Sequence, residues 1–252
     1  MNKHTLVHGD CLEEMSTIED NSVDMVMTDP PYGTTACKWD SVIPFEPMWE
    51  QLRRITKDNG AIVLMGNQPF TSALVMSNLK MYRYEWTWEK NNVSGFANAK
   101  RRPLKVTENV LVFSKKEPVY FPQGLVVLKT PRIRNAKVGD AVGGIGFYDG
   151  YSQTHTNYPK NVLKFALDKN KLHPTQKPVA LMKYLIKTYT NEDDLVIDFT
   201  MGSGSTGVAC ADTGRRFWGC ELLPEKEDDP DYFGIASKRV KDAYEKPRLF
   251  FD

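Results

Sequence analysis

Four consecutive residues, Asp29-Pro30-Pro31-Tyr32, combine groups that can bind an amino group of a substrate. The two prolines fix the backbone and remove two N–H donors, which leaves the Asp29 carboxylate and the Pro30 carbonyl as rigid acceptors. Such a pair can accept both N–H bonds of an –NH₂ group, and the flat ring of Tyr32 can stack on the molecule that carries it. An ordinary turn after a strand has the same composition, so the tetrapeptide alone does not decide between the two interpretations.

A second candidate site is a glycine-rich turn, Gly202-Ser203-Gly204-Ser205-Thr206-Gly207, which matches the pattern G-x-G-x-x-G. The turn follows an apolar segment and precedes a predicted helix, and Glu221 ends the next predicted strand. Glycines let the backbone approach a ligand, a helix start offers N–H groups, and an acidic residue can accept hydrogen bonds from ribose hydroxyls. This context predicts a bound cofactor, either a dinucleotide or S-adenosylmethionine, more strongly than a turn without a ligand.

Two details favour S-adenosylmethionine. Asp198 precedes the turn, where its charge would repel a pyrophosphate but would suit the ammonium group of a methionine moiety. The turn also comes late, near residue 200, whereas dinucleotide-binding domains usually begin with it.

These segments together resemble the amino-methyltransferases that modify adenine N6 or cytosine N4 in DNA. Gly9-Asp10 resembles an element that contacts the cofactor adenine, 91–113 resembles the post-catalytic region, and 173–178 (HPTQKP) resembles a segment near the methionine carboxylate. The resemblance covers nearly the whole chain. Because the tetrapeptide comes first and the cofactor turn last, the order resembles the permuted class called beta.

The resemblance implies roles for individual residues. Within the family's Asp-Pro-Phe-x-Gly pattern, Phe199 stands where proline is common and Thr200 where phenylalanine is common, so either can pack on the cofactor. The implied catalytic residues are Asp29, Pro30, Pro31 and Tyr32, and the implied cofactor-binding residues are Asp10, Cys11, Thr175, Lys177, Asp198, Phe199, Thr200, Gly202, Ser203, Gly204, Ser205, Thr206 and Glu221.

The activity implied is S-adenosylmethionine-dependent methylation of adenine N6, on a base flipped out of a specific DNA duplex sequence. Such an enzyme would be of the restriction-modification type. Cytosine N4 methylation is the nearest alternative, but Asp29 favours adenine because serine is more common at that position in the cytosine enzymes. Methylation of RNA or of a protein amide is a weaker alternative, since the long basic segment favours nucleic acid and the beta-like order favours DNA. A NAD-dependent oxidoreductase leaves 29–32 and 173–178 unexplained, and a non-catalytic DNA-binding module would not need a cofactor turn.

These residues need a sheet that brings them together. Strands and helices alternate along most of the chain, which predicts an α/β, Rossmann-like methyltransferase fold with a circularly permuted, seven-stranded, mostly parallel sheet and helices on both faces. The carboxyl ends of such strands share one edge, so we expect Asp29 and Gly202 to lie close together. The predicted strands are 5–8, 23–28, 61–65, 82–89, 107–113, 195–199 and 216–221, and the predicted helices are 44–56, 69–78, 179–190, 203–212 and 232–244.

The stretch 116–171 differs from the rest because it is rich in Lys, Arg, Gly, Pro and Tyr and lacks a clear period. We interpret it as a target-recognition insertion in a catalytic and cofactor-binding domain made of 1–115 and 172–252.

Charge is unevenly distributed along the chain. The net charge is +1, yet the segment from Lys90 to Lys177 holds 16 Lys or Arg and 5 Asp or Glu. This imbalance predicts a surface that faces a polyanion, here double-stranded DNA, and the glycine- and aromatic-rich 143–151 is a candidate to enter it. The candidate DNA-binding residues are Lys100, Arg101, Arg102, Lys105, Arg132 and Arg134, although a solvated surface is the better explanation for any single one of them.

Other classes of protein are disfavoured by composition. No apolar run reaches the roughly 18 residues of a membrane span, and residues 1–14 lack a signal-peptide core, so we expect a cytoplasmic protein without a membrane partner. The four cysteines are scattered, which predicts free thiols, and the four histidines lack metal-ligand spacing, which predicts no metal. The family resemblance also points to a homodimer.

Overall fold

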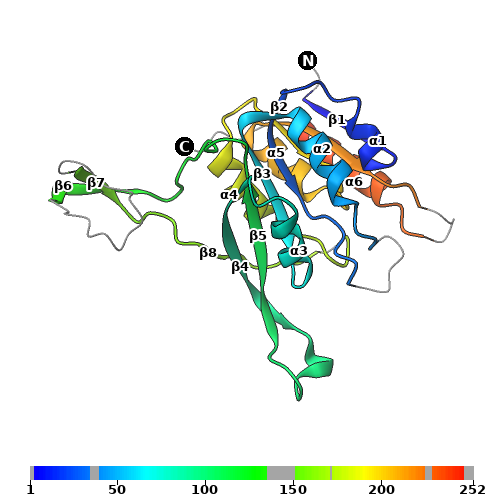
Figure 1. Cartoon of the computed structure of the whole chain (residues 1–252), viewed down its shortest axis with the longest axis horizontal. Helices are drawn as coiled ribbons and strands as arrows, with labels where there is room; N and C mark the ends of the chain where they lie inside the picture. Colours follow the sequence, from blue (N-terminus) through cyan, green and yellow to red (C-terminus); the bar gives the residue numbers. More distant parts are fainter. Residues whose placement is uncertain (1–2, 35–39, 135–150, 171, 225–228, 247–252) are drawn as a thin grey trace. The chain divides into compact units, whose positions relative to one another are not determined.

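The computed structural model describes residues 3–34, 40–134, 151–170, 172–224 and 229–246 (Figure 1). The chain forms two compact units. The first consists of Met1–Phe121 and Asn161–Asp252, and the second of Pro122–Lys160. The second unit is shorter than the stretch 116–171 that the sequence set apart.

An eight-stranded sheet forms the centre of the first unit, in the order β1-β10-β9-β2-β3-β5-β4-β8. The first five of these strands are parallel, β5 is antiparallel to both neighbours, and β8 is parallel to β4. All seven predicted strands are present. The strands are β1 (His4–His8), β2 (Val23–Thr28), β3 (Thr56–Gly66), β4 (Tyr82–Ser94), β5 (Lys105–Phe113), β8 (Val162–Lys164), β9 (Leu195–Asp198) and β10 (Arg216–Glu221).

The segment in which the sequence shows no regular period contains three strands. The short strand β8 adds an eighth member to the sheet, next to β4. In the second unit, β6 (Val126–Arg134) and β7 (Tyr151–Thr156) form an antiparallel pair with Val127 opposite His155. None of these three strands has a clean alternation of apolar and polar residues, so the sequence offered no period-two signal.

The last two strands lie between the first two, as the permuted order requires. β10 pairs with β1, with Glu221 opposite His8, and β9 pairs with β2, with Val196 opposite Met25. The carboxyl ends of β1, β10, β9 and β2 therefore meet at one edge of the sheet, where ligands bind in open α/β folds.

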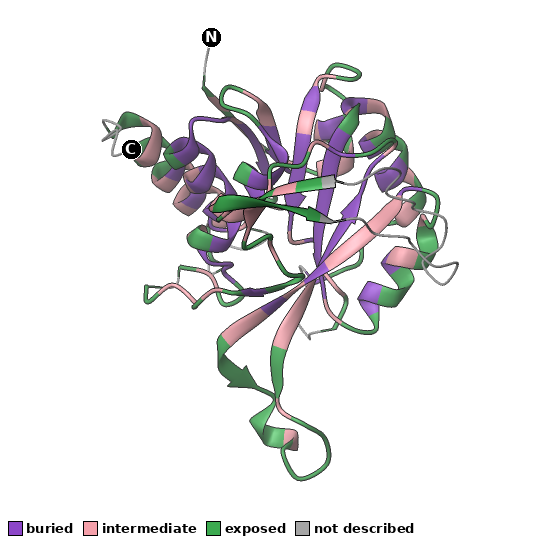
Figure 2. Cartoon of the chain, turned by 90° about the vertical axis from the view of Figure 1, so that its left-hand side faces the viewer, coloured by how far each residue is buried: buried purple, intermediate pink, exposed green. Residues whose placement is uncertain are grey.

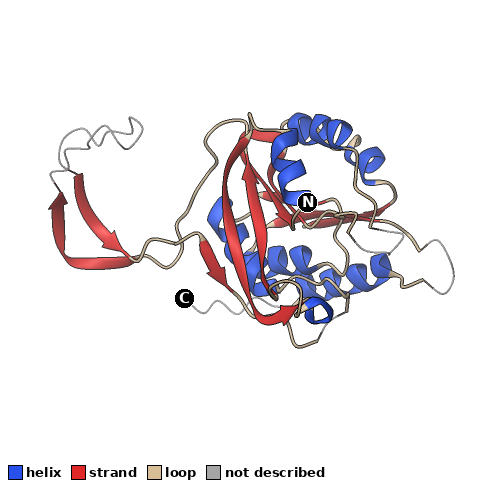
Figure 3. Cartoon of the chain, turned by 60° about the horizontal axis from the view of Figure 1, so that its bottom comes forward, coloured by secondary structure: helices blue, strands red, loops and turns tan. Residues whose placement is uncertain are grey.

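Helices cover both faces of the sheet (Figure 3). α1 (Cys11–Met15), α2 (Phe45–Ile55) and α3 (Phe70–Ser77) supply residues to one core cluster, and α4 (Val179–Tyr189), α5 (Ser205–Thr213) and α6 (Tyr232–Glu245) supply the other. Alternate residues of one strand enter opposite clusters: Met25 and Met27 pack towards α4, whereas Val26 packs towards α2. Among the described helices, none has the length and apolar character needed to cross a membrane.

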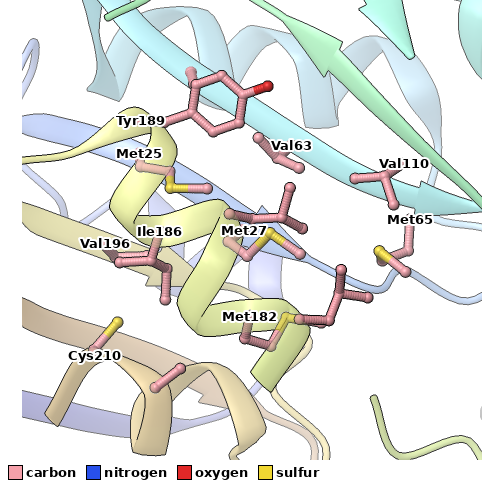
Figure 4. Close-up of a cluster of buried hydrophobic side chains, with 14 of the residues drawn as sticks. Met25, Met27, Val63, Met65, Val110, Met182, Ile186, Tyr189, Val196 and Cys210 are labelled. Atoms are coloured by element: carbon pink, nitrogen blue, oxygen red, sulfur yellow. The ribbon is translucent and has the colours of Figure 1, made fainter. Parts of the chain in front are cut away.

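The core holds the sheet edge rigidly. In the cluster shown in Figure 4, methionines of β2 and β3 pack against α4 and α5, and their side chains are almost fully buried. Burial of each such side chain contributes about 1.5–3 kcal/mol, so strand ends that carry polar groups are anchored on both faces. The cluster includes Met25, Met27, Val63, Met65, Met182, Ile186, Val196 and Cys210.

Candidate active site

The ends of β2 and β9 are joined by the carboxylate of Asp198. Thr28 Oγ1 and Thr200 N donate to Asp198 Oδ1 at 2.6 and 3.2 Å, and Thr206 Oγ1 from the first turn of α5 donates to Oδ2 at 2.6 Å. Burial raises the pKa of Asp198 to about 7, and the threonine donors oppose that rise because they stabilise the charged form. This carboxylate therefore ties two strand ends and the glycine turn into one unit.

Asp29 lies beside the glycine turn, as predicted from the shared edge of the sheet. Thr200 Oγ1 donates to the backbone oxygen of Asp29 at 3.2 Å, although the two residues are 171 positions apart. Thr200 Oγ1 also lies 2.6 Å from Thr28 Oγ1. The expected meeting of the early tetrapeptide and the late turn is confirmed.

The Asp29 carboxylate is part of a chain of four charges. Lys177 Nζ donates to Asp29 Oδ2 and lies 3.4 Å from Glu108 Oε2, and Lys90 Nζ lies 2.9 Å from Glu108 Oε1. The four side chains, Lys90, Glu108, Lys177 and Asp29, are between 8% and 22% exposed and are named the charge chain below. Two positive and two negative charges balance, which offsets the cost of removing them from water.

The ionisation of the charge chain follows from its geometry. Burial lowers the pKa of Lys177, but Asp29 and Glu108 outweigh burial and raise it. Burial raises the pKa of Glu108, but the two lysines outweigh burial and lower it. Burial also raises the pKa of Asp29, and Lys177 opposes that rise. The lysine therefore stays protonated and stabilises the ionised form of Asp29.

Tyr32 is held by its backbone and its ring. Its amide and that of Gly33 donate to Asp40 Oδ1 at 2.7 and 2.9 Å, and its ring centroid lies 5.1 Å from that of Phe70. The Tyr32 hydroxyl donates to Asp29 Oδ1. Burial raises the pKa of Tyr32, and the negative charge of Asp29 adds to the rise, so the phenol remains a donor.

The glycines of the turn have different functions. Gly204 has φ +78°, and a Cβ there would lie 3.0 Å from Val240 Cγ2, while a Cβ at Gly207 would lie 2.5 Å from the same atom. Both glycines are therefore needed for packing against α6. Among the described residues, a Cβ at Gly202 would meet His173 Cδ2 alone, at 4.0 Å, so the backbone there is open to a ligand.

Two elements hold the turn from outside it. Arg239 Nη1, on α6, donates to the backbone oxygen of Ser203 at 2.9 Å and lies 3.3 Å from Ser205 Oγ. Ser203 Oγ donates to Gln176 Oε1 at 3.2 Å. No sequence pattern pointed to Arg239, because a single arginine on an amphipathic helix usually lies on the face that is exposed to solvent.

Glu221 and Asp10 reach the same edge from β10 and β1. Glu221 accepts from Gly202 N at 2.6 Å, and burial raises its pKa. Asp10 caps α1 by accepting from Leu12 N at 2.8 Å, and the backbone N of the preceding Gly9 donates to the Glu221 carbonyl at 3.1 Å.

Residues 173–177 approach the turn and Asp29. Thr175 N donates to His173 Nδ1 at 3.1 Å, and the His173 ring centroid lies 4.1 Å from that of Tyr232. Burial and the charge of Lys177 lower the pKa of His173 to about 4, so the ring is neutral at pH 7. The Lys177 ammonium contacts Asp29, whereas the sequence had predicted it for the cofactor.

Several residues predicted to bind the cofactor have side chains that are buried or bonded within the protein. Phe199 is 1% exposed and packs in the cluster on the α2 face, so its ring is not available to a ligand. Thr200 instead faces the site. The hydroxyls of Ser203 and Thr206 are buried and bonded internally, so those residues offer a ligand mainly their backbone. Cys11 is half-buried, and burial raises the pKa of its thiol to about 12.

The six predicted DNA-binding residues are divided between the two units. Lys100, Arg101, Arg102 and Lys105 are exposed on the hairpin that joins β4 and β5, in the first unit. Arg132 is exposed on β6 of the second unit, and Arg134 ends that strand. The candidate segment 143–151 lies outside the described residues except for Tyr151 at the start of β7.

The chain is similar in sequence to proteins of known family. The family model described as DNA methylase matches residues 23–229. DNA adenine methyltransferase YhdJ of Escherichia coli is 29% identical over 88% of this chain and 79% of its own length. Type II methyltransferase M1.MboII of Moraxella bovis is 29% identical over 85% of this chain and 90% of its own length.

Solved structures agree with the fold. The structure titled as the M1.HpyAVI-SAM complex has a TM-score of 0.61 and 26% identity, covering 94% of this chain and 99% of its own. The PvuII DNA methyltransferase, described as cytosine-N4-specific, has a TM-score of 0.67 and covers 97% of this chain and 92% of its own. Because its identity is 16%, it supports the fold alone.

Proposed function

Because the chain belongs to the DNA methylase family, we propose that it transfers a methyl group from S-adenosylmethionine to the N6 amino group of adenine in DNA. The observation that carries the proposal is the contact between the rigid tetrapeptide and Thr200, which lies two residues before the glycine turn. The Thr200 hydroxyl is 3.2 Å from the Asp29 carbonyl. A cofactor held by the turn and an amino group held by Asp29 would then be neighbours.

The residues at the sheet edge fit S-adenosylmethionine. The open backbone at Gly202 lies next to the start of α5, and Glu221 and Asp10 supply carboxylates from the two neighbouring strands. We assign these residues, together with the backbone of Ser203, Gly204 and Ser205 and the side chains of Thr175 and Thr200, to cofactor binding. When bound, the cofactor supplies an electrophilic methyl group on a sulfonium.

Asp29 and the Pro30 carbonyl would bind the two N–H groups of the target base. An ionised carboxylate has about four acceptor directions, and Lys177 and Tyr32 use one on each oxygen, so Asp29 can accept a further bond without losing either partner. Such bonding favours a tetrahedral nitrogen whose lone pair is free to attack. Burial raises the pKa of Asp29 and Lys177 opposes that rise, so the lysine favours the ionised carboxylate. The acceleration comes from positioning and from preorganised acceptors.

Adenine is favoured over cytosine by two observations. Asp29 stands where the cytosine enzymes more often have serine, and a relative that matches most of this chain is named a DNA adenine methyltransferase. Cytosine N4 methylation uses the same amino chemistry and is the alternative that the experiment below distinguishes.

We further propose that the second unit and the β4–β5 hairpin hold the DNA. Both carry exposed cations, which suit phosphates. The target base must leave the duplex to reach Asp29, and Tyr32 would stack on it. A homodimer and a cytoplasmic location are also proposed; sedimentation of the purified chain tests the former.

The function is tested by incubating the purified protein with methyl-labelled S-adenosylmethionine and mixed-sequence duplex DNA. Digestion to nucleosides and mass spectrometry should find the label in N6-methyladenine, and modification-sensitive sequencing of the same DNA gives the recognition sequence. Label in N4-methylcytosine would select the alternative base. Label in no nucleoside, with calorimetric binding of NAD in place of S-adenosylmethionine, would overturn the proposal.

A further inference from the structure

The tip of the β4–β5 hairpin is strongly basic. Between Glu89 and Glu108 the chain holds five Lys or Arg and no acidic residue. Lys90 is paired with Glu108, but none of Lys100, Arg101 and Arg102 forms an ion pair with a described carboxylate. Figure 2 shows this hairpin extending from the buried sheet, with intermediate burial where its strands leave the sheet and a mostly exposed tip.

A phenylalanine stands at the tip among these cations. Phe96 is 74% exposed and begins a short 3₁₀ turn, Phe96–Asn98. It follows Gly95, whose φ of +88° reverses the chain and whose surroundings are open for 4 Å. Val93 and Val106, on the two strands behind it, are 46% and 36% exposed. The sequence and backbone thus present one aromatic ring at the end of a basic hairpin.

We propose that Phe96 inserts into the base stack of the DNA duplex beside the target nucleotide, while the neighbouring Lys and Arg side chains bind the flanking phosphates. The inference rests on the proposed function. Proteins that distort DNA commonly insert an apolar side chain between base steps, and enzymes that act on a base must meet the cost of unstacking it. A ring at this position would lower that cost by replacing stacking contacts that the extruded base gives up.

The hairpin starts at the catalytic edge and is long enough for this function. Lys90 and Glu108 of its two strands belong to the charge chain that ends at Asp29. At about 3.3 Å per residue, Ser94 lies roughly 13 Å beyond Lys90, which exceeds the depth of about 8 Å of a B-DNA groove. When the first unit binds the duplex at its catalytic edge, the tip of the hairpin can therefore reach the bases.

A second copy of this chain is a poorer occupant for the same surface. Two identical tips would bring cations against cations without acidic residues to balance them, whereas DNA offers about one negative charge per 1.7 Å. Charge complementarity thus selects DNA over self-association.

The test measures single-turnover methylation of two duplexes that carry the recognition sequence identified by the modification-sensitive sequencing proposed for the function. One has its target adenine paired with thymine, and the other has it mismatched, which reduces the cost of extrusion. The variants are Phe96→Ala, Phe96→Leu, which keeps an apolar wedge, and the control Leu79→Ala. Leu79 is 57% exposed and precedes the opposite end of β4.

We expect Phe96→Ala to slow methylation of the paired target at least about tenfold and of the mismatched target less than about threefold, because the full cost of unstacking arises only in the paired duplex. Phe96→Leu should recover most of the loss, and Leu79→Ala should change neither rate. The salt dependence of binding should be the same in Phe96→Ala and wild type, because the cations remain.

Equal losses on both duplexes, or no loss on either, would overturn the inference while leaving the proposed function intact. A conversion of dimer to monomer by Phe96→Ala in sedimentation, without a difference between the two duplexes, would show instead that the tip is an interface between copies. Wild-type protein that methylates neither duplex would overturn the proposed function and the inference together.

Discussion

The catalytic edge and the hairpin tip use polar groups in opposite ways. At the edge, Asp198 accepts three hydrogen bonds within the protein and Asp29 is flanked by Lys177 and Tyr32. At the tip, Lys100, Arg101 and Arg102 have no ion-pair partner among the described residues. Groups that must be positioned to within a fraction of an ångström are bonded internally, whereas groups that only need to meet a polyanion are left in water. Substitutions in the two regions should therefore differ in size and in kind.

The largest effect is expected at Asp29. Asp29→Ala removes the carboxylate that binds the amino group, and the rate of methyl transfer should fall by about 10²–10³-fold or more, as for other preorganised groups at a reacting centre. The dissociation constant for S-adenosylmethionine, measured by calorimetry, should stay within about threefold of wild type. Near wild-type turnover in this variant would remove Asp29 from the mechanism.

A smaller effect is expected at Thr206, which also bonds internally at the edge. Thr206→Val deletes the donor to Asp198 Oδ2 and should lower the free energy of unfolding by about 1–3 kcal/mol. Because the hydroxyl stabilises the ionised carboxylate, the loss should be greater above pH 7 than below it, and the pKa of Asp198 should rise further above about 7. Urea unfolding at two pH values measures this, with Thr206→Ser as the matched control that keeps the donor.

Charge reversal at the tip should have a different signature. Replacing Arg101 and Arg102 by glutamate should weaken DNA binding about tenfold at moderate salt and reduce the slope of log K against log salt by about 0.9 for each phosphate that the protein no longer binds. Stability should be unchanged because both side chains are exposed. Fluorescence anisotropy over a salt series makes the measurement, and an unchanged slope would exclude both residues from the DNA interface.

The smallest effect is a dependence of stability on pH through His173. Its pKa is about 4 in the folded protein and 6.5 when unperturbed, so the unfolded state binds more protons between those values and stability falls as the pH drops through that window. Because the ring is partly exposed, the wild type should lose only about 1 kcal/mol more than His173→Gln between pH 7 and pH 5. Identical losses in the two proteins would show that another group is responsible.

The sequence predicted the seven main strands and the meeting of Asp29 with the glycine turn because each follows from a pattern contained in a short stretch of sequence. Buried parallel strands are recognised as continuous apolar runs. The tetrapeptide and the glycine turn each follow the carboxyl end of such a strand, and these ends share one edge of the sheet. The three-residue strand β8 has one buried residue and no such run. The placement of Lys177 on Asp29, and of Arg239 on the turn, depends on how helices and loops pack across more than 30 positions, which no short pattern records.

Phe199 shows the limit of reasoning by motif. The family pattern left Phe199 and Thr200 equally eligible to face the cofactor. Both lie in the turn that follows β9, and packing decides between them because Phe199 is buried in the core cluster on the α2 face. The charge chain was missed for a related reason: Lys90 and Glu108 belong to separate strands, and their pairing is visible only once β4 and β5 are in register.

The strand order also has a consequence for how the protein is made. Among the described strands β1 pairs with β10 alone, so β1 waits during synthesis for a partner that follows it by more than 200 residues. The Asp29 segment likewise gains its neighbour Thr200 only after most of the chain has been synthesised. Contacts of such long sequence separation form slowly. A nascent chain interrupted before residue 195 would have no β9 or β10 and no glycine turn, so methylating activity would appear only late in synthesis.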